Sequence, residues 1–455
     1  MSSMNATQAC FTPGARRRIK DSPLNICLYT YRGKPTSGGQ GVYIKRLSRA
    51  LKDIGHNVEV VSGPPYPIID TDIPLHRIPS LDLYNPDDLF RLPSIRELSS
   101  PINMLEWLGV SSGGFPEPFT NSMRYYHFMR KNLHRYDVVH DNQCLGYGIL
   151  GVKSLGIPTV ATIHHPITVD RDVEIASVRP LWRKLKVRRW YSFLGMQGRV
   201  SRKLSHIITV SEASRHDISR AFSIPGERFR VVANGINTDI FHPLPGERRL
   251  DNHLMVTNSA DTPLKGLRFL IEAVHSIRKK RDIRLTVIGA PKKDGDIDRL
   301  VRSLGTQDYV TFTGRIDDDD FARYYARTTI AVVPSIYEGF GLPAGEAMAC
   351  RVPVISSTGG ALPEVVGEAG VLVPPGDAGS LEAAIIDLLD NPDKCERLAQ
   401  AGYDRVKKYF TWHNTATQVV DVYREAIEHY TTGRSVNRPE AGLSGGYREA
   451  VDAHG

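Results

Sequence analysis

Residues 334–349 read PSIYEGFGLPAGEAMA, in which two carboxylates, Glu338 and Glu346, flank a glycine-rich turn. A short β-branched run precedes the turn, and small and apolar residues suited to a helix follow it. Gly339 and Gly341 allow the backbone to approach a ligand closely, because glycine carries no Cβ. The stretch therefore predicts a strand, a tight turn and a helix, with room for a ligand at the start of the helix.

The start of this predicted helix is suited to an anion. Pro343 fits the first helical position, and the free N–H groups there, aided by the helix dipole, attract negative charge. A carboxylate beside a bound phosphate would be repelled, so we expect Glu338 and Glu346 to face hydroxyl groups. Backbone amides on a diphosphate and carboxylates on sugar hydroxyls together favour a nucleotide-sugar as the ligand.

The same half of the chain alternates between strands and helices. Short buried strands are expected at 254–257, 285–289, 310–314, 330–334, 352–356 and 371–373. Helices lie between them, for example over 266–279 and 380–389. Strands that alternate with helices indicate a parallel sheet in a doubly wound unit.

The first half of the chain opens in the same way. Residues 25–30 (NICLYT) predict a strand, the loop over 33–41 carries glycines, and a helix ended by Gly55 leads to a strand over 58–61. Further strands are expected at 138–139, 159–163 and 206–210. Between residues 64 and 119 the pattern is lost, and this stretch is predicted to be a long insertion or loop region on the acceptor side.

The chain of 455 residues is long enough for two hydrophobic cores. A turn-rich segment that begins at residues 233–236 (ANGI) marks the predicted boundary, with a first domain over 23–235 and a second over 236–408. Residues 1–22 and 433–455 are predicted to be a disordered arm and a disordered tail.

The composition is that of an ordinary soluble protein, with 41% hydrophobic and 24% charged residues. The five cysteines lack paired spacing, which favours reduced thiols in a cytosolic protein over a disulfide framework or a zinc site. No run of about 18 apolar residues suits a membrane span, and the first 22 residues do not resemble a signal peptide. A net charge of +8 favours anionic partners.

Around its two glutamates the sequence resembles glycosyltransferase family 4, a group of retaining enzymes of GT-B fold, in which two Rossmann-like domains face each other across a cleft. The shared signature is a glutamate, seven residues and a second glutamate, with GFGLP between them. The resemblance runs from about Asn25 to Tyr430. Its further landmarks are Val210-Ser211, Ala233-Asn234-Gly235-Ile236, Phe241, Lys265-Gly266, Phe312-Thr313-Gly314 and Gly359-Gly360-Ala361-Leu362-Pro363-Glu364.

The resemblance implies a glycosyltransferase that takes a sugar from a nucleotide-sugar donor, and a role for each matching residue. Glu338 should contact sugar hydroxyls, and Glu346 should contact the ribose hydroxyls. Lys265 should neutralise the diphosphate as it leaves. His164, next to His165, is expected to be the cleft histidine near the sugar. The donor should also be held by Gly38, Gly39, Gly339, Phe340, Gly341 and Leu342.

The C-terminal helix and the mechanism also follow from the resemblance. The helix after Trp412 should cross back onto the first domain over residues 409–432, and its apolar face fits this path: Val419, Val420, Tyr423 and Ile427. Retention of configuration is implied by the family alone, because no second-face nucleophile is evident. The base, the sugar and the acceptor are not specified.

The sequence departs from the family at the diphosphate. Family members usually have an arginine a few residues before the lysine, whereas residues 257–265 read TNSADTPLK, with Asp261 adding negative charge. Either another cation, such as Arg315, takes the place of this arginine, or the diphosphate is bound more weakly.

We expect no metal and no cofactor. Lys265 and the amides at the helix start would replace the divalent ion that enzymes with a DxD motif use. Asp317 to Asp320 imitate that motif, but acids at the start of the predicted helix over 321–327 favour the helix dipole and solvent. The pair His164-His165 has no acid or cysteine at ligand spacing.

Other functions remain open on these residues. Residues 38–41 (GGQG) with Glu59 imitate a dinucleotide-binding fingerprint, but Ile44 stands where the third glycine belongs. A different GT-B enzyme, such as a phosphorylase or a nucleotide-sugar epimerase, would share the same landmarks. So would a catalytically silent sugar-binding protein.

Residues 179–203 interleave basic and aromatic side chains, and no acid occurs from Ile175 to Ser211. Such a segment suits an interfacial helix on anionic lipid, which predicts a cytoplasmic protein with peripheral membrane contact. Two alternatives are an ordinary amphipathic helix with its aromatics in the core and a nucleic-acid groove, for which no accompanying motif is present.

Overall fold

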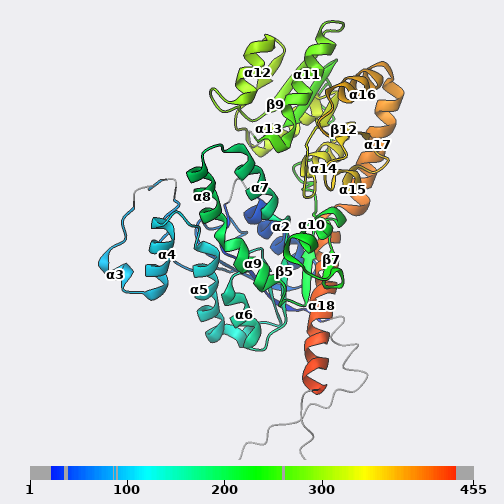
Figure 1. Cartoon of the computed structure of the whole chain (residues 1–455). Coiled ribbons are helices and arrows are strands. Elements are labelled where there is room, and N and C mark those ends of the chain that lie inside the picture. The colour runs from blue at the N-terminus through cyan, green and yellow to red at the C-terminus, as the bar shows by residue number, and fades with distance from the viewer. Residues whose placement is uncertain (1–21, 35–38, 86, 89–90, 259–261, 437–455) are drawn as a thin grey trace, which may run out of the picture.

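A computed structural model of the protein describes residues 22–34, 39–85, 87–88, 91–258 and 262–436. They form two parallel sheets that belong to two domains, one above the other in Figure 1. The predicted pair of doubly wound domains is therefore confirmed. The predicted disordered arm and tail fall almost entirely on residues 1–21 and 437–455, which lie outside the described residues.

The first domain contains a seven-stranded sheet in the order β3-β2-β1-β4-β5-β6-β7. Its strands are β1 (Asn25–Thr30), β2 (Asn57–Ser62), β3 (Leu75–Arg77), β4 (Val138–Asn142), β5 (Thr159–Thr162), β6 (His206–Thr209) and β7 (Phe229–Val231). Five of these strands were predicted. The two that the sequence pattern missed, β3 and β7, are three residues long and lie at the edges, where little burial marks them.

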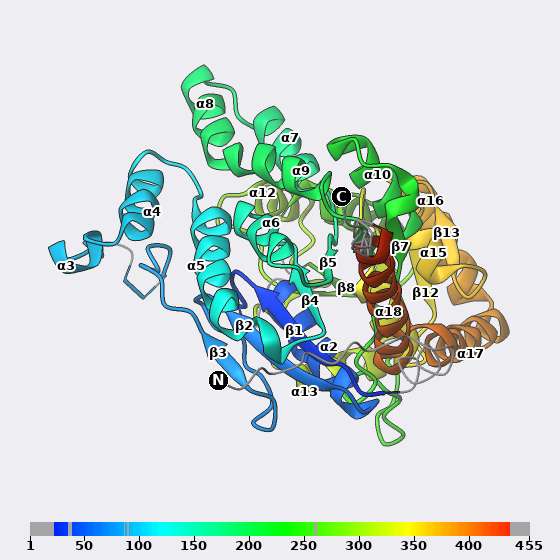
Figure 2. The ribbon, with the colours of Figure 1, turned by 90° about the horizontal axis from the view of Figure 1, so that it is seen from below.

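Helices cover both faces of this sheet. They are α2 (Gly39–Asp53), α3 (Ile95–Leu98), α4 (Pro101–Ser111), α5 (Glu117–Asn132), α6 (Tyr147–Ser154), α7 (Ile167–Ser177), α8 (Leu181–Trp190), α9 (Leu194–Ser201) and α10 (Glu212–Phe222). Alternate residues of β1 enter different cores: Cys27 and Tyr29 pack beneath α5, whereas Ile26 and Leu28 pack beneath α2. Figure 2 shows these two layers on opposite sides of the strands.

The prediction of an irregular stretch over 64–119 was wrong in part, because it contains β3, α3, α4 and the start of α5. Helix α4 escaped notice because it has the reverse of the usual amphipathic pattern. Its acid, Glu106, is buried in an ion pair with Arg124 at 2.5 Å, whereas Leu105 and Leu108 are exposed. A pattern that assumes apolar residues inside does not find such a helix.

The second domain contains a six-stranded sheet in the order β10-β9-β8-β11-β12-β13. Its strands are β8 (His253–Thr257), β9 (Arg284–Ile288), β10 (Val310–Phe312), β11 (Ile330–Val333), β12 (Val354–Ser357) and β13 (Val371–Val373). Its helices are α11 (Leu267–Arg278), α12 (Asp296–Leu304), α13 (Asp318–Arg327), α14 (Leu342–Ala349), α15 (Leu362–Val366), α16 (Ala378–Asp390) and α17 (Pro392–Tyr409). Each of the six predicted strands is found.

The last helix, α18 (Trp412–Val436), runs from the second domain back along the first (Figure 1). Its predicted apolar face packs against the core of the first domain through Val419, Val420 and Tyr423. The Tyr423 hydroxyl lies 2.6 Å from His140 Nδ1 on β4. The crossing over is therefore confirmed, and the helix continues past the predicted bound at residue 432.

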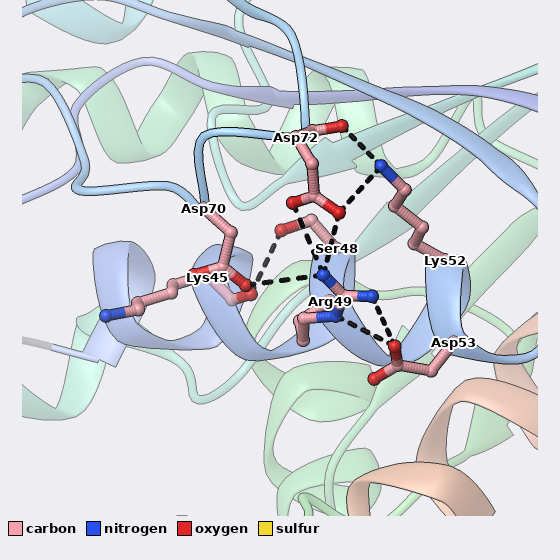
Figure 3. A network of polar contacts seen from close by, with 7 residues as sticks. All are labelled: Lys45, Ser48, Arg49, Lys52, Asp53, Asp70 and Asp72. Carbon is pink, nitrogen blue, oxygen red and sulfur yellow. Dashed lines mark hydrogen bonds and ion pairs between the residues drawn. The ribbon is translucent and has the colours of Figure 1, made fainter.

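Short 3₁₀ helices complete the chain: η1 (Leu133–Arg135), η2 (Tyr191–Phe193), η3 (Gly226–Arg228) and η4 (Pro263–Lys265). On the outer face of α2, Arg49 lies 3.0 Å from Asp72, and Lys52 lies 2.9 Å from the same carboxylate (Figure 3). These ion pairs fasten the segment after β2 to α2. Because they are exposed to solvent, each contributes at most about 1 kcal/mol.

Strand order reverses between β1 and β4 in the first sheet and between β8 and β11 in the second. In open parallel sheets, ligands bind outside the carboxyl ends of the strands at such a reversal. The loops that follow β8 and β11 carry Lys265 and Glu338, respectively. The topology thus places both predicted site residues where a ligand site is expected.

Candidate active site

Lys265 and Glu338 meet at the reversal of the second sheet. Lys265 ends η4, and Glu338 lies in the turn between β11 and α14. The Lys265 Nζ atom lies 2.6 Å from Glu338 Oε1, and the Ser335 hydroxyl donates to the same oxygen at 2.8 Å. The turn is thus held with its carboxylate beside a cation, at the edge of the sheet where the predicted diphosphate would lie.

The turn before α14 requires glycine at Gly341. This residue is the N-cap of the helix, with a left-handed φ of 107°, and a Cβ here would lie 2.7 Å from the Leu362 side chain. Pro343 was predicted to be the first residue of the helix. The helix begins one residue earlier, at Leu342, so Pro343 is its second residue. No acceptor within the described ranges satisfies the N–H groups of Gly341 and Leu342, which leaves two donors for an anion.

The other predicted donor residues of this turn have different environments. The Phe340 side chain is buried and packs edge-to-face against Phe410, with ring centroids 5.8 Å apart. Only its backbone can therefore contact a ligand. Glu346 is half-buried on α14, and its Oε2 atom lies 3.5 Å from the hydroxyl of Tyr325. Burial raises the pKa of Tyr325, so this phenol stays protonated and can donate.

His164 follows β5 and reaches the cleft from the first domain. Its Nε2 atom lies 2.8 Å from Asn142 Oδ1, while the Asn142 amide nitrogen donates to the carbonyl of Gln40 at 3.3 Å. With its oxygen so oriented, Asn142 accepts the Nε2 proton and leaves Nδ1 as an acceptor. Burial lowers the pKa of His164 to about 3, which keeps the imidazole neutral.

The two domains touch where these residues lie. A Cβ on Gly339 would lie 3.2 Å from His165 Cβ and 3.3 Å from the His164 carbonyl oxygen. The Glu338 turn therefore faces the end of β5 directly. The two histidines differ: the His164 ring is held by Asn142, whereas His165 turns to Asp170, 2.9 Å from its Nε2.

Two predicted residues, Gly39 and Arg315, have no contact with this pair among the described residues. Gly38 lies outside the described residues, and so does Asp261. Gly39 is the exposed first residue of α2, with open space around it. Arg315 is exposed after β10, two strands away from β8. Its role in place of the absent arginine stays a prediction.

Some polar residues of the site were missed by the sequence analysis. Besides Ser335 and Asn142, Asn258 is buried at the carboxyl end of β8, and its amide atoms have no partner among the described residues. A polar residue directly after a buried strand was the available signal. Glu59 would bind the ribose in the dinucleotide-binding alternative. Its carboxylate instead accepts a hydrogen bond from Tyr136 at 2.6 Å and lies 2.7 Å from His76, which argues against that alternative.

The four acids over 317–320 lie at the start of α13, which begins at Asp318. Within the residues that the structure describes, no three His, Cys, Asp or Glu side chains gather as metal ligands would. In the same residues, no helix combines the length and the apolar character needed to cross a bilayer.

Comparisons with known proteins agree with this architecture. The family model described as Glycosyltransferase Family 4 matches residues 37–240, and the one described as Glycosyl transferases group 1 matches residues 251–391. The MMP alpha-(1->4)-mannosyltransferase of Mycolicibacterium hassiacum is 44% identical over 408 residues, which are 89% of this chain and 98% of that protein. The D-inositol 3-phosphate glycosyltransferase of Thermobispora bispora is 28% identical over 439 residues, 91% of this chain and 97% of that protein.

Among solved structures, sucrose-phosphate synthase from Thermosynechococcus elongatus superposes with a TM-score of 0.64 and 25% identity, over 89% of this chain and 100% of that one. The fold, the order of motifs and the near-complete coverage of the mannosyltransferase all point to the same family. The chain therefore belongs to glycosyltransferase family 4 and is a glycosyltransferase of GT-B fold.

Proposed function

We propose that the protein transfers a sugar from a nucleoside diphosphate-sugar to a hydroxyl group of an acceptor, with retention of configuration and without a metal ion. The Lys265–Glu338 pair carries the proposal. It lies at the reversal of the second sheet, and Glu338 shares its turn with Gly341 and Leu342, whose N–H groups have no acceptor in the part of the chain that the structure describes. A cation and two amide donors suit a diphosphate, and a carboxylate between them and the cleft suits a sugar.

In the proposed reaction, Lys265 turns from Glu338 toward the diphosphate as negative charge develops on the leaving group. Glu338 then accepts a hydrogen bond from a sugar hydroxyl, and Glu346 accepts from the ribose. The neutral imidazole of His164 accepts a hydrogen bond at Nδ1 from a hydroxyl in the cleft. The departing diphosphate takes the proton of the acceptor hydroxyl, which needs no enzymic nucleophile.

The sugar is proposed to be mannose, because the relative that is 44% identical is a mannosyltransferase by name. The donor can be identified by thermal unfolding with UDP-, GDP- and ADP-sugars, including GDP-mannose. A ligand at 100 times its dissociation constant adds roughly 2.7 kcal/mol to stability. One base should stabilise the protein distinctly, and the matching mannose donor should be turned over in the presence of an oligosaccharide acceptor.

The alternatives give different outcomes in the same assay. A phosphorylase would release sugar phosphate when inorganic phosphate is added, and an epimerase would convert the donor without any acceptor. A catalytically silent protein would be stabilised by the donor but would transfer no radiolabelled mannose to any of the acceptors supplied. Each of these results would contradict the proposed transfer.

We also propose that α8 contacts an anionic lipid surface at the cytoplasmic face of a membrane. Three of its apolar side chains are more than half exposed: Leu181 by 71%, Trp182 by 54% and Leu185 by 55%. The neighbouring cations Arg183 and Lys186 lie 5.2 Å and 4.9 Å from the Trp182 ring. The combination of exposed apolar and basic side chains on one helix supports lipid contact.

In the rest of the basic segment, the apolar side chains pack against the first domain while most of the cations are exposed. Trp190 stacks on Phe115 with ring centroids 5.0 Å apart, and Met196 and Val200 of α9 are buried. The single interfacial helix predicted over 179–203 is thus two helices separated by η2, and only α8 presents apolar residues to solvent. Figure 1 shows α7 and α8 on the edge of the first domain nearest the second.

A further inference from the structure

Helix α10 of the first domain contacts the second domain on both sides of Glu338. We propose that α10 holds the Glu338 turn in its working position from across the cleft, through Glu364, Ser214 and the Asp217–Tyr337 pair. These are positioning residues: Ser214, Asp217 and Tyr337 join the turn to α10, Glu364 joins α15 to α10, and none of them contacts the substrate in the proposed site. The inference rests on the proposed function of Glu338.

The first contact is a helix cap supplied by the opposite domain. Glu364, on α15, accepts the backbone N–H of Glu212 at 2.7 Å and that of Ala213 at 2.8 Å. The first N–H groups of a helix have no partner within the helix, and a carboxylate there also complements the helix dipole. If the domains separated, the N–H groups of Glu212 and Ala213 would lose this carboxylate and bind water instead. The cap therefore favours the closed arrangement of the two domains.

The second contact involves the residue after Glu338. The carbonyl oxygen of Gly339 accepts from the Ser211 hydroxyl at 2.8 Å. The Ser214 hydroxyl lies 2.9 Å from the same oxygen and 3.2 Å from the His164 carbonyl oxygen. A hydroxyl has one proton to donate, so Ser214 bridges the end of β5 and the Glu338 turn by serving either oxygen.

The third contact involves the residue before Glu338. The Tyr337 hydroxyl donates to Asp217 Oδ2 at 2.8 Å. Asp217 lies one helical turn beyond Ser214 on α10, so both contacts come from one face of the helix. Residues on either side of Glu338 are thereby fixed to the same element of the first domain.

The Glu338 turn and the capping glutamate are also joined within the second domain. The Glu338 carbonyl oxygen accepts from Ala361 N at 2.9 Å, and a Cβ on Gly360 would overlap that carbonyl. Ala361 directly precedes α15, which carries Glu364. Because the turn and α15 are in such close contact, a release of Glu364 from α10 loosens the turn as well.

The inference is tested by removing the cap and comparing it with a matched carboxylate. Glu364→Ala should lower kcat by about tenfold or more, because small displacements of a positioned group have large effects on rate. Donor affinity should change by less than about threefold, since the proposed contacts to the nucleoside diphosphate, from Lys265, Glu346 and the N–H groups at the start of α14, lie on the second domain. Glu364→Gln, which keeps one acceptor oxygen, should fall in between. The control is Glu425→Gln, which breaks an ion pair with Arg230 at the back of the first domain.

The Asp217–Tyr337 pair gives an independent test. The variants Asp217→Asn and Tyr337→Phe should each reduce kcat, and the double variant should be no worse than the more affected single one, because both remove the same contact. Additive losses would contradict a shared contact.

The Glu364 test has its own contradicting outcomes. The positioning role would be overturned if Glu364→Ala lost no more kcat than Glu425→Gln, or if a folded Glu364→Ala protein kept the wild-type kcat.

Small-angle X-ray scattering separates this inference from the proposed reaction, because it requires no turnover. The radius of gyration of Glu364→Ala should exceed that of the wild type and of Glu425→Gln, since the domains are less firmly held together. Equal radii would overturn the role of α10 in closure. A wild-type protein that turns over no sugar would contradict the proposed function alone. The scattering result would still show whether α10 holds the two domains together.

Discussion

Lys265 and Glu338 stand 73 residues apart in the chain and form an ion pair of 2.6 Å where β8 and β11 end. The pair joins the two sides of the strand-order reversal, and Glu338 lies in the turn that leads into α14. Because the two charges are coupled, the loss of one residue changes the setting of the other. The proposed donor site can therefore be tested by comparing the two single variants with the double variant.

Lys265→Ala should lower kcat/KM by roughly 100-fold, since the loss of one contact to a developing charge costs about 3 kcal/mol. Glu338→Gln should also slow turnover, because a charge-assisted hydrogen bond to a sugar hydroxyl is weakened. The double variant should lose less than the sum of the two. A control is Arg49→Gln, which removes only the exposed ion pairs of Arg49 in Figure 3 and should leave turnover unchanged. Wild-type turnover in both single variants would refute the assignment.

Gly341→Ala should reduce both stability and turnover. A left-handed φ of 107° is unfavourable for alanine, by about 1–2 kcal/mol, and the added Cβ would also press on Leu362. Gly195→Ala on α9 is the matched control, because nothing lies within 4 Å of a Cβ there and Gly195 has no part in the proposed site. Chemical denaturation of both variants measures the difference. Equal stabilities would show that the turn before α14 tolerates a side chain.

The pH dependence of stability should change in His164→Asn. The pKa of His164 is about 3 in the folded protein and 6.5 as a model value, so below pH 6.5 the unfolded chain binds a proton that the folded protein does not. This costs the wild type about 1.4 kcal/mol for each pH unit of acidification in that window.

The variant lacks this cost. Its stability relative to the wild type should therefore rise by about 1.4 kcal/mol per unit between pH 6 and pH 4. Asp141 and Glu117, whose pKa values burial raises to about 7, act in the opposite direction but equally in both proteins. Urea unfolding at three pH values gives the difference. A difference that stays flat with pH would contradict a His164 that stays neutral in the folded protein.

The strands were predictable because most are short β-branched runs bounded by glycine or proline, as in 330–333 before the Glu338 turn. Helix α4 was not, since its apolar residues face solvent and its acid is buried. Of the candidate site, Glu338, Glu346 and Lys265 belong to local motifs and could be named in advance. Their partners could not, because those contacts link distant segments: Ser211 and Gly339 are 128 residues apart, and Glu212 and Glu364 are 152 apart.

Turnover should persist in EDTA. In the proposed site, the Lys265 ammonium and the amides of α14 supply the positive field that a divalent ion provides in other glycosyltransferases. The measurement is the initial rate with the identified donor before and after chelation. Complete loss of activity that manganese restores would instead direct attention to the acids over 317–320 at the start of α13.

The full-length protein should sediment with vesicles that contain anionic lipid and should be released by salt. Each cation of α8 near the surface adds about 1 kcal/mol, or about fivefold in partitioning, and the attraction is screened at high ionic strength. Trp182→Ala and Lys186→Gln should each weaken sedimentation, since they remove an exposed apolar and a basic group of the same helix. Leu105→Ala is the control, because this leucine is exposed to a similar degree on α4, a helix that carries no basic side chain. Binding to neutral vesicles alone, equal sedimentation of all variants, or no binding to anionic vesicles at low salt would each show that α8 is a solvated flank of the enzyme.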